Sequence, residues 1–223
     1  MQALTYFRWD DEQAEAALPL MMEEVTGSVL GPGIEDRNVA VTMLGYRKKD
    51  MAQMRLPRLG KAYPRLIDGL KSGGLNAIAL RVLGSDARAW SFLFGYESNY
   101  GKRTDRGFLK WQMPDEWPLD PALAKGVTEL LSLCCEHLDV TAGGAVAEDP
   151  WEYGCYAKAA SPSPGAARYV GDAVLDYSWQ VVLPPAAALR LDLPAIAGLV
   201  ETYRPVVWSD GRTGAVTCLA PLR

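Results

Sequence analysis

The chain has 223 residues, of which 49% are hydrophobic and 22% are charged, and its formal net charge is −4 at pH 7. This composition is ordinary for a soluble globular protein, and the acidic balance argues against nucleic acid as the main partner. The charge is uneven, because residues 46–110 hold fourteen basic and five acidic residues whereas both flanking segments are acidic. Such a division is typical of patches that partly neutralise each other on a folded surface, and it also fits a face that meets a charged partner.

The N-terminal segment predicts a strand followed by a helix. Residues 3–9, ALTYFRW, are rich in aromatic side chains and favour a first strand. Asp10 is suited to cap the helix that follows, and Pro19 predicts a kink or a restart in it. Apolar residues at helical spacing predict its buried face. These are Ala14, Ala17, Leu18, Met21, Met22 and Val25.

The middle of the chain predicts mainly strands. A second strand is expected over residues 38–46, a basic loop with at most a helical turn over 46–61, and a short helix over 62–73. Three further strands, joined by turns, are expected over 75–83, 87–97 and 106–114. In the last of these, the sequence LKWQM alternates inward and outward positions, as a half-buried antiparallel strand requires.

The C-terminal part begins with a second long helix. Asp120 and Pro121 form a cap and a first helical position, and the helix runs to residue 138. Its predicted buried face comprises Leu123, Val127, Leu130, Leu131, Cys134 and Leu138. Strands over 140–149 and 175–185 follow, and then two short helices and a closing hairpin with Asp210 and Gly211 in its turn.

Strands outnumber helices in this order, and hairpins recur among them. The sequence therefore predicts an α+β fold with a largely antiparallel β-sheet and helices packed on one face. We expect a single domain over residues 1–223, and a division into two β-α-β-rich halves near residue 105 is also compatible with the pattern.

Motifs that carry catalysis or bind a cofactor are not found. The sequence has no GxSxG, GxxxxGK[ST] or GxGxxG motif, and its one histidine, His137, lies at a predicted helix end, where an imidazole has a structural role. The four cysteines show no CxxC spacing, so we expect free thiols in a reducing compartment and neither a zinc site nor a disulfide framework. We predict no catalytic, cofactor-binding or metal-binding residue. The N-terminus lacks a secretory signal pattern and no apolar run approaches about 18 residues, which predicts a cytoplasmic protein without membrane contact.

Acidic and aromatic side chains gather in two connecting segments. The predicted contact residues are Asp115, Glu116, Trp117, Glu148, Asp149, Trp151 and Glu152. Aromatic anchors beside a charged rim are typical of protein–protein interfaces, although the same rings also serve as core or loop-pinning groups. Adjacent acids on one element point apart, so they are poor candidates for a catalytic pair.

Three stretches of residues 106–223 have a characteristic order of elements: FLKWQMPDEWPLDPALAKGVTELL, VTAGGAVAEDPWEYG, and the closing YSWQVVLPPAAALRL, LPAIAGL and VVWSDGRTGAVTCLAPL. In this order, residues 106–223 resemble the immunity proteins of bacterial polymorphic toxin systems, in particular the type VI secretion immunity family. The resemblance implies a non-enzymatic, cytoplasmic inhibitor that binds one cognate toxin by direct protein–protein contact.

Two other functions remain open from the sequence. An enzyme acting on a small molecule would require a deep pocket in which several ionisable groups converge with perturbed pKa values. A self-assembling structural or regulatory module would form a stable homo-oligomer, which is compatible with the aromatic content.

Overall fold

The computed structural model describes most of the chain. The described residues are 2–29, 39–45, 52–82, 91–99, 102–112, 121–146, 180–190 and 202–218, together with 192, 194, 195, 198 and 200.

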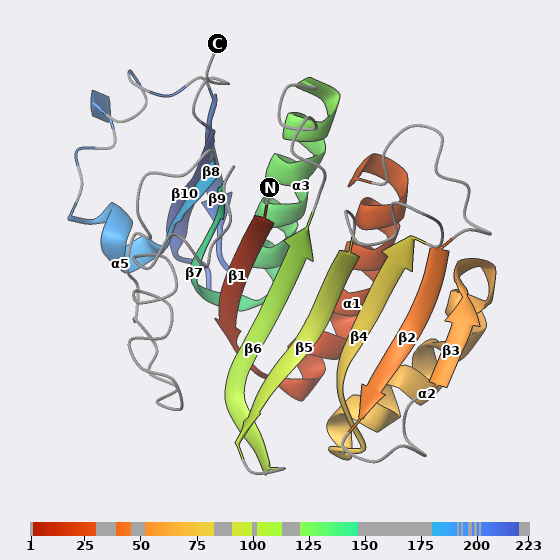
Figure 1. The fold of residues 1–223 in the computed structure, drawn as a ribbon. Coiled ribbons are helices and arrows are strands. Elements are labelled where there is room, and N and C mark those ends of the chain that lie inside the picture. Colours follow the sequence, from red (N-terminus) through yellow and green to blue (C-terminus); the bar gives the residue numbers. More distant parts are fainter. Residues whose placement is uncertain are drawn as a thin grey trace.

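Ten strands in the described residues form one antiparallel sheet, in the order β3-β2-β4-β5-β6-β1-β7-β8-β10-β9 (Figure 1). Along the chain, the first six strands are β1 Gln2–Arg8, β2 Val39–Gly45, β3 Ala52–Arg55, β4 Leu75–Val82, β5 Ser91–Asn99 and β6 Lys102–Gln112. The remaining four are β7 Asp139–Val146, β8 Gln180–Leu183, β9 Thr202–Val207 and β10 Thr213–Cys218. The N-terminal strand β1 lies inside the sheet, where it pairs with β6 on one side and β7 on the other.

Three long helices lie on one face of this sheet (Figure 1). The helices are α1 Asp11–Glu24, α2 Leu59–Lys71, α3 Pro121–His137 and the short α5 Pro185–Ala188, with a π-helix η1 Val25–Val29 and a 3₁₀ turn η4 Leu56–Arg58. The predicted α+β class, with an antiparallel sheet and helices on one face, is confirmed. None of the described helices combines the length and the apolar character that a membrane-spanning helix needs.

The start of α1 follows the sequence prediction. The Asp10 side chain accepts hydrogen bonds from the backbone amides of Glu12, at 3.0 Å, and Gln13, at 2.9 Å, so it caps the helix as expected. Pro19 lies within the helix, which continues through it without a restart. All six predicted core positions of this segment, Ala14, Ala17, Leu18, Met21, Met22 and Val25, are buried.

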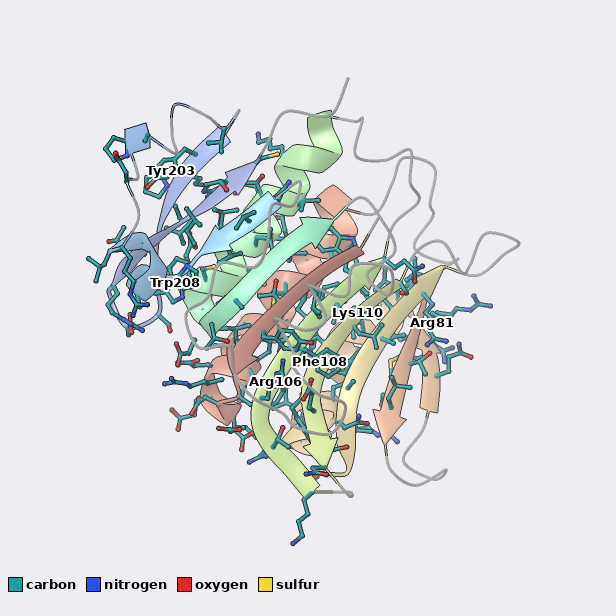
Figure 2. The ribbon with its side chains drawn as sticks, turned by 60° about the vertical axis from the view of Figure 1, so that its left-hand side comes forward. Arg81, Arg106, Phe108, Lys110, Tyr203 and Trp208 are labelled. Carbon is teal, nitrogen blue, oxygen red and sulfur yellow. The ribbon has the colours of Figure 1, made fainter. Side chains whose placement is uncertain are left out.

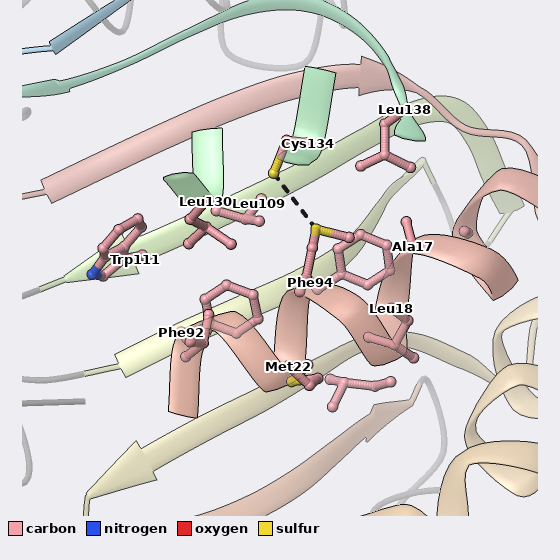
Figure 3. Close-up of a cluster of buried hydrophobic side chains, with 14 of the residues drawn as sticks. Ala17, Leu18, Met22, Phe92, Phe94, Leu109, Trp111, Leu130, Cys134 and Leu138 are labelled. Atoms are coloured by element: carbon pink, nitrogen blue, oxygen red, sulfur yellow. Dashed lines mark hydrogen bonds between the residues drawn. The ribbon is translucent and has the colours of Figure 1, made fainter. Parts of the chain in front are cut away.

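The core lies between α1, α3 and the central strands (Figure 3). Phe92 and Phe94 of β5 and Leu109 and Trp111 of β6 are fully buried against this layer. The contact between the Cys134 thiol and the Met21 sulfur, at 3.5 Å, joins the two helices. Burying one side chain of this size stabilises the fold by about 1.5–3 kcal/mol, so this cluster is the main support of the central sheet.

The closing hairpin of β9 and β10 is also confirmed. Gly211 has φ +83°, a left-handed conformation that glycine adopts without strain, and Asp210 accepts a hydrogen bond from the Arg212 backbone amide at 3.0 Å. The indole of Trp208 donates to the backbone oxygen of Val140 at 3.0 Å, which ties the hairpin to the central sheet.

The basic segment after residue 46 differs from its prediction. A loop with at most a helical turn was expected over 46–61, but β3 occupies Ala52–Arg55 and α2 already begins at Leu59. The four residues of β3 carry no strand signal of their own, and they are fixed as an edge strand because β2 offers a free row of backbone groups. After α1, the chain continues directly into the π-helix η1, Val25–Val29.

Candidate functional site on the outer face of the sheet

The sheet has two unlike faces, which its register defines. Side chains that point toward α1, α2 and α3 form the main core, and the opposite side is called here the outer face. On β6, Gly107, Leu109 and Trp111 are buried on the helix side. The alternate positions Phe108 and Lys110 are only partly buried, and Figure 2 shows them following Arg106 along the outer face of this strand.

Three rows of residues cross the outer face from strand to strand. The first row runs Arg55–Ala40–Arg81–Ser91–Gln112. The second runs Gln53–Thr42–Ala79–Leu93–Lys110–Leu4. The third runs Leu44–Ala77–Gly95–Phe108–Tyr6–Ala142. Side chains in one row are direct cross-strand neighbours and interact with one another.

These rows combine cationic and apolar groups, and we call their central part the outer patch. It consists of the cations Arg55, Arg81 and Lys110 and the partly exposed apolar side chains Leu4, Leu93 and Phe108. The three rows contain no acidic residue. Lys110 stands between Leu93 and Leu4, so its aliphatic stem can pack on two leucines while its ammonium group reaches water.

One end of the outer patch is closed by a cluster around Arg106. The Arg106 guanidinium lies over the Tyr6 ring, 3.9 Å from its centroid, and its Nη1 is 3.4 Å from Oε2 of Glu97. Arg106 is only 1% exposed, so its charge is engaged within the protein. Burial raises the pKa of the Tyr6 hydroxyl; the nearby Arg106 charge lowers it and the Glu97 charge raises it further. Tyr6 is therefore a neutral phenol at physiological pH.

The beginning of β7 supplies one more charge pair near this cluster. Arg8 follows Tyr6 on the outer side of β1, and its Nη1 is 3.6 Å from Oδ2 of Asp139. An exposed pair of this kind contributes at most about 1 kcal/mol, but it leaves Asp139 with a cation beside it.

The three described cysteines are in no position to act as nucleophiles. Burial raises the pKa of the Cys134 thiol to about 12, and burial together with the neighbouring Cys134 and Glu136 charges raises that of Cys135 well above its usual range. Both remain protonated thiols in the core, and Cys218 is also buried. In the described part of the chain, no group of three or more His, Cys, Asp and Glu side chains is placed to hold a metal ion.

The seven contact residues predicted from the sequence lie outside the described residues. Asp115, Glu116 and Trp117 fall within 113–120, and the other four fall within 147–179. Their role as a contact surface stays a prediction. The outer patch was not identified from the sequence, although the excess of basic residues over 46–110 and the alternation in LKWQM are the signals that point to it.

Comparison with known proteins identifies a shared fold. No protein-family model matches the chain, and no curated protein sequence is significantly similar to it. Among solved structures, the fold is similar to that of the Pseudomonas aeruginosa T6SS protein PA0821, with a TM-score of 0.59 and 11% sequence identity. The superposition covers 99% of this chain and 67% of that chain. The likeness at this identity concerns the fold, and it extends over nearly the whole of this chain.

Proposed function

We propose that this protein is an immunity protein, which binds and neutralises a toxic effector of a bacterial type VI secretion system by direct protein–protein contact. The observation that carries the proposal is the fold likeness to a T6SS protein over 99% of the chain. The resemblance of residues 106–223 to the type VI immunity family, which concerns the order of their elements, supports the same proposal.

The mode of action is occlusion of the effector in the cytoplasm. Such an inhibitor needs a rigid surface that presents a few anchor side chains and a charged rim, and it needs no reactive group. A sheet packed against three helices through a buried core provides this rigidity, because its surface side chains are attached to strands and not to loops.

The proposal is tested with the protein encoded by the adjacent gene. We expect that protein to be toxic when expressed alone in bacteria, to be harmless when the present chain is coexpressed, and to bind it in a biolayer-interferometry assay. A product that is neither toxic nor bound contradicts the proposal. A stable homo-oligomer in light scattering that excludes the product would instead favour a self-assembling module.

The acidic aromatic segments remain candidate contacts in this function. Asp115→Lys combined with Glu116→Lys is expected to leave the melting temperature within about 2 °C of the wild type, because the sequence predicts a connecting segment there and exposed substitutions seldom change stability by more than about 0.5 kcal/mol. Binding should weaken, mainly through a slower association rate. The matched control is Glu23→Lys with Glu136→Lys, since both glutamates are exposed on helices. If the two double variants bind alike, residues 115 and 116 are only part of a turn.

A further inference from the structure

The outer patch differs from an ordinary solvated sheet face in the residues it carries. An antiparallel sheet that faces water on one side normally places polar residues there. Here Leu4, Leu93 and Phe108 occupy central positions of three adjacent strands and are partly exposed. Apolar groups that cluster on a surface and are rimmed by charge mark interaction sites more often than scattered ones do.

The charge of the patch is opposite to that of the whole chain. The protein has a net charge of −4, yet each charged residue in the three rows is a cation. Of the described carboxylates near these rows, Glu97 is engaged with Arg106 and Asp139 with Arg8. Arg81 and Lys110 have no ion pair with any described residue, and Arg81 is exposed. Among the described residues, the charge carried by this face is therefore positive.

No described helix lies over this part of the sheet, in which Arg55 and Arg81 are exposed while Ala40, Ala77 and Ala79 of the rows are at most 1% exposed. Helices α1, α2 and α3 lie on the opposite face, and the short α5 packs against β10, away from β4, β5 and β6 (Figure 1). Figure 2 shows Arg81 on one side of the patch and Phe108 and Lys110 near its centre. Five steps between adjacent strands from β3 to β1, at about 4.8 Å each, give a width of about 24 Å, which suits a protein surface and not a single small anion.

We propose that the outer patch is the surface that receives the effector, and that the effector presents to it acidic side chains around an apolar anchor; this inference rests on the immunity function proposed above. Charge complementarity identifies this occupant. Arg81 and Lys110 steer and pair with carboxylates, while Phe108, between Gly95 and Tyr6 in its row, supplies apolar contact.

Two other occupants fit the patch less well. A second copy of the chain docked face to face would bring the same cations together, which costs free energy. Nucleic acid is bound through many phosphate contacts, whereas this patch has an apolar centre and belongs to a chain of net charge −4.

The test compares two double charge reversals in the full chain. The test variant is Arg81→Glu with Lys110→Glu. The control is Lys61→Glu with Arg65→Glu, which changes the net charge by the same amount at exposed positions of α2. Association with the purified product of the adjacent gene is measured by biolayer interferometry at low and high salt. We expect the test variant to associate at least tenfold more slowly at low salt, with the difference shrinking as salt increases, and the control to stay within about twofold of the wild type.

A second pair of variants examines the apolar anchor. Phe108→Ala is expected to raise the dissociation rate about tenfold or more, while Leu20→Ala, at a 39% exposed position on α1, leaves it unchanged. The melting temperature of each variant shows that the fold is retained. If the Phe108 variant is destabilised, the association rates of the two charge-reversal variants alone decide whether the outer patch binds the effector.

The outcomes separate the inference from the function on which it rests. If the wild type and all variants bind the product equally, the immunity function stands and the outer patch is overturned as its surface. If the wild type does not bind, both are overturned. A labelled DNA duplex bound by the wild type and lost in the Arg81 and Lys110 variant would also overturn the inference, because the patch would then be a nucleic-acid site.

Discussion

Gly95 on β5 tests the close approach of β4 and β5 on which the outer patch depends. A Cβ atom added at Gly95 would lie 2.2 Å from the backbone oxygen of Asn76 and 2.7 Å from both Cα and Cβ of Ala77. Backbone atoms cannot rotate out of the way, so Gly95→Ala must push β4 from β5. Overpacking of this kind costs up to about 3 kcal/mol. For a domain of this size the melting temperature should fall by about 6–12 °C.

The control for this variant is Gly60→Ala in the first turn of α2. A Cβ at Gly60 meets no atom within 4 Å, and alanine is favoured over glycine in a helix by up to about 1 kcal/mol. This variant should melt about 2–4 °C above the wild type. Both are measured by circular dichroism on heating. If Gly95→Ala melts within about 1 °C of the wild type, β4 and β5 are not as close as described, and the pairing of Ala77 with Gly95 in the row through Phe108 would be wrong.

Three further changes probe the elements that hold this sheet. Asp10→Ala removes the cap of α1 and should lower the free energy of unfolding by about 1 kcal/mol in urea titration, and an unchanged midpoint would argue against the cap. Tyr96→Phe removes a buried hydroxyl that donates to the Leu75 backbone oxygen, and the unpaired acceptor should cost about 1–3 kcal/mol; a smaller loss would mean that water replaces the hydroxyl. Burial raises the pKa of Cys134 to about 12, so the folded state favours the protonated thiol. The stability that this preference adds to the fold is complete below the pKa of an unfolded thiol and is lost as pH rises toward 12. Iodoacetamide at pH 8 should therefore leave Cys134 unmodified in the native protein and alkylate it in urea, as peptide mass spectrometry can show, and native labelling would contradict its burial.

Local patterns account for most of the elements. Helix α1 follows from the Asp10 cap and its apolar stripe, and the closing hairpin follows from Asp210 and Gly211 in a left-handed turn. Alternation in LKWQM also predicts which side chains of β6 face outward. These features depend on residues close in the chain, so the sequence is sufficient to find them.

The limits of the sequence appear where pairing partners decide the structure. Strand β3 has no signal of its own, and it forms because β2 presents an open edge. The contact residues predicted from clusters of acidic and aromatic side chains lie outside the described residues, so they stay a prediction, and the outer face was not among the surfaces predicted. Those contact residues were chosen because they lie close together in the sequence, whereas residues that share a face of the sheet come from distant parts of the chain.

The sequence by itself determined that this is an α+β protein with an antiparallel sheet, capped helices and a basic middle segment. Only the tertiary structure decided that Arg55, Arg81 and Lys110, which come from β3, β4 and β6, share one face with Leu93 and Phe108. The physical reason is register: a shift of one residue in any strand moves all of its side chains to the opposite face, and register is set by the packing of the buried face against the helices.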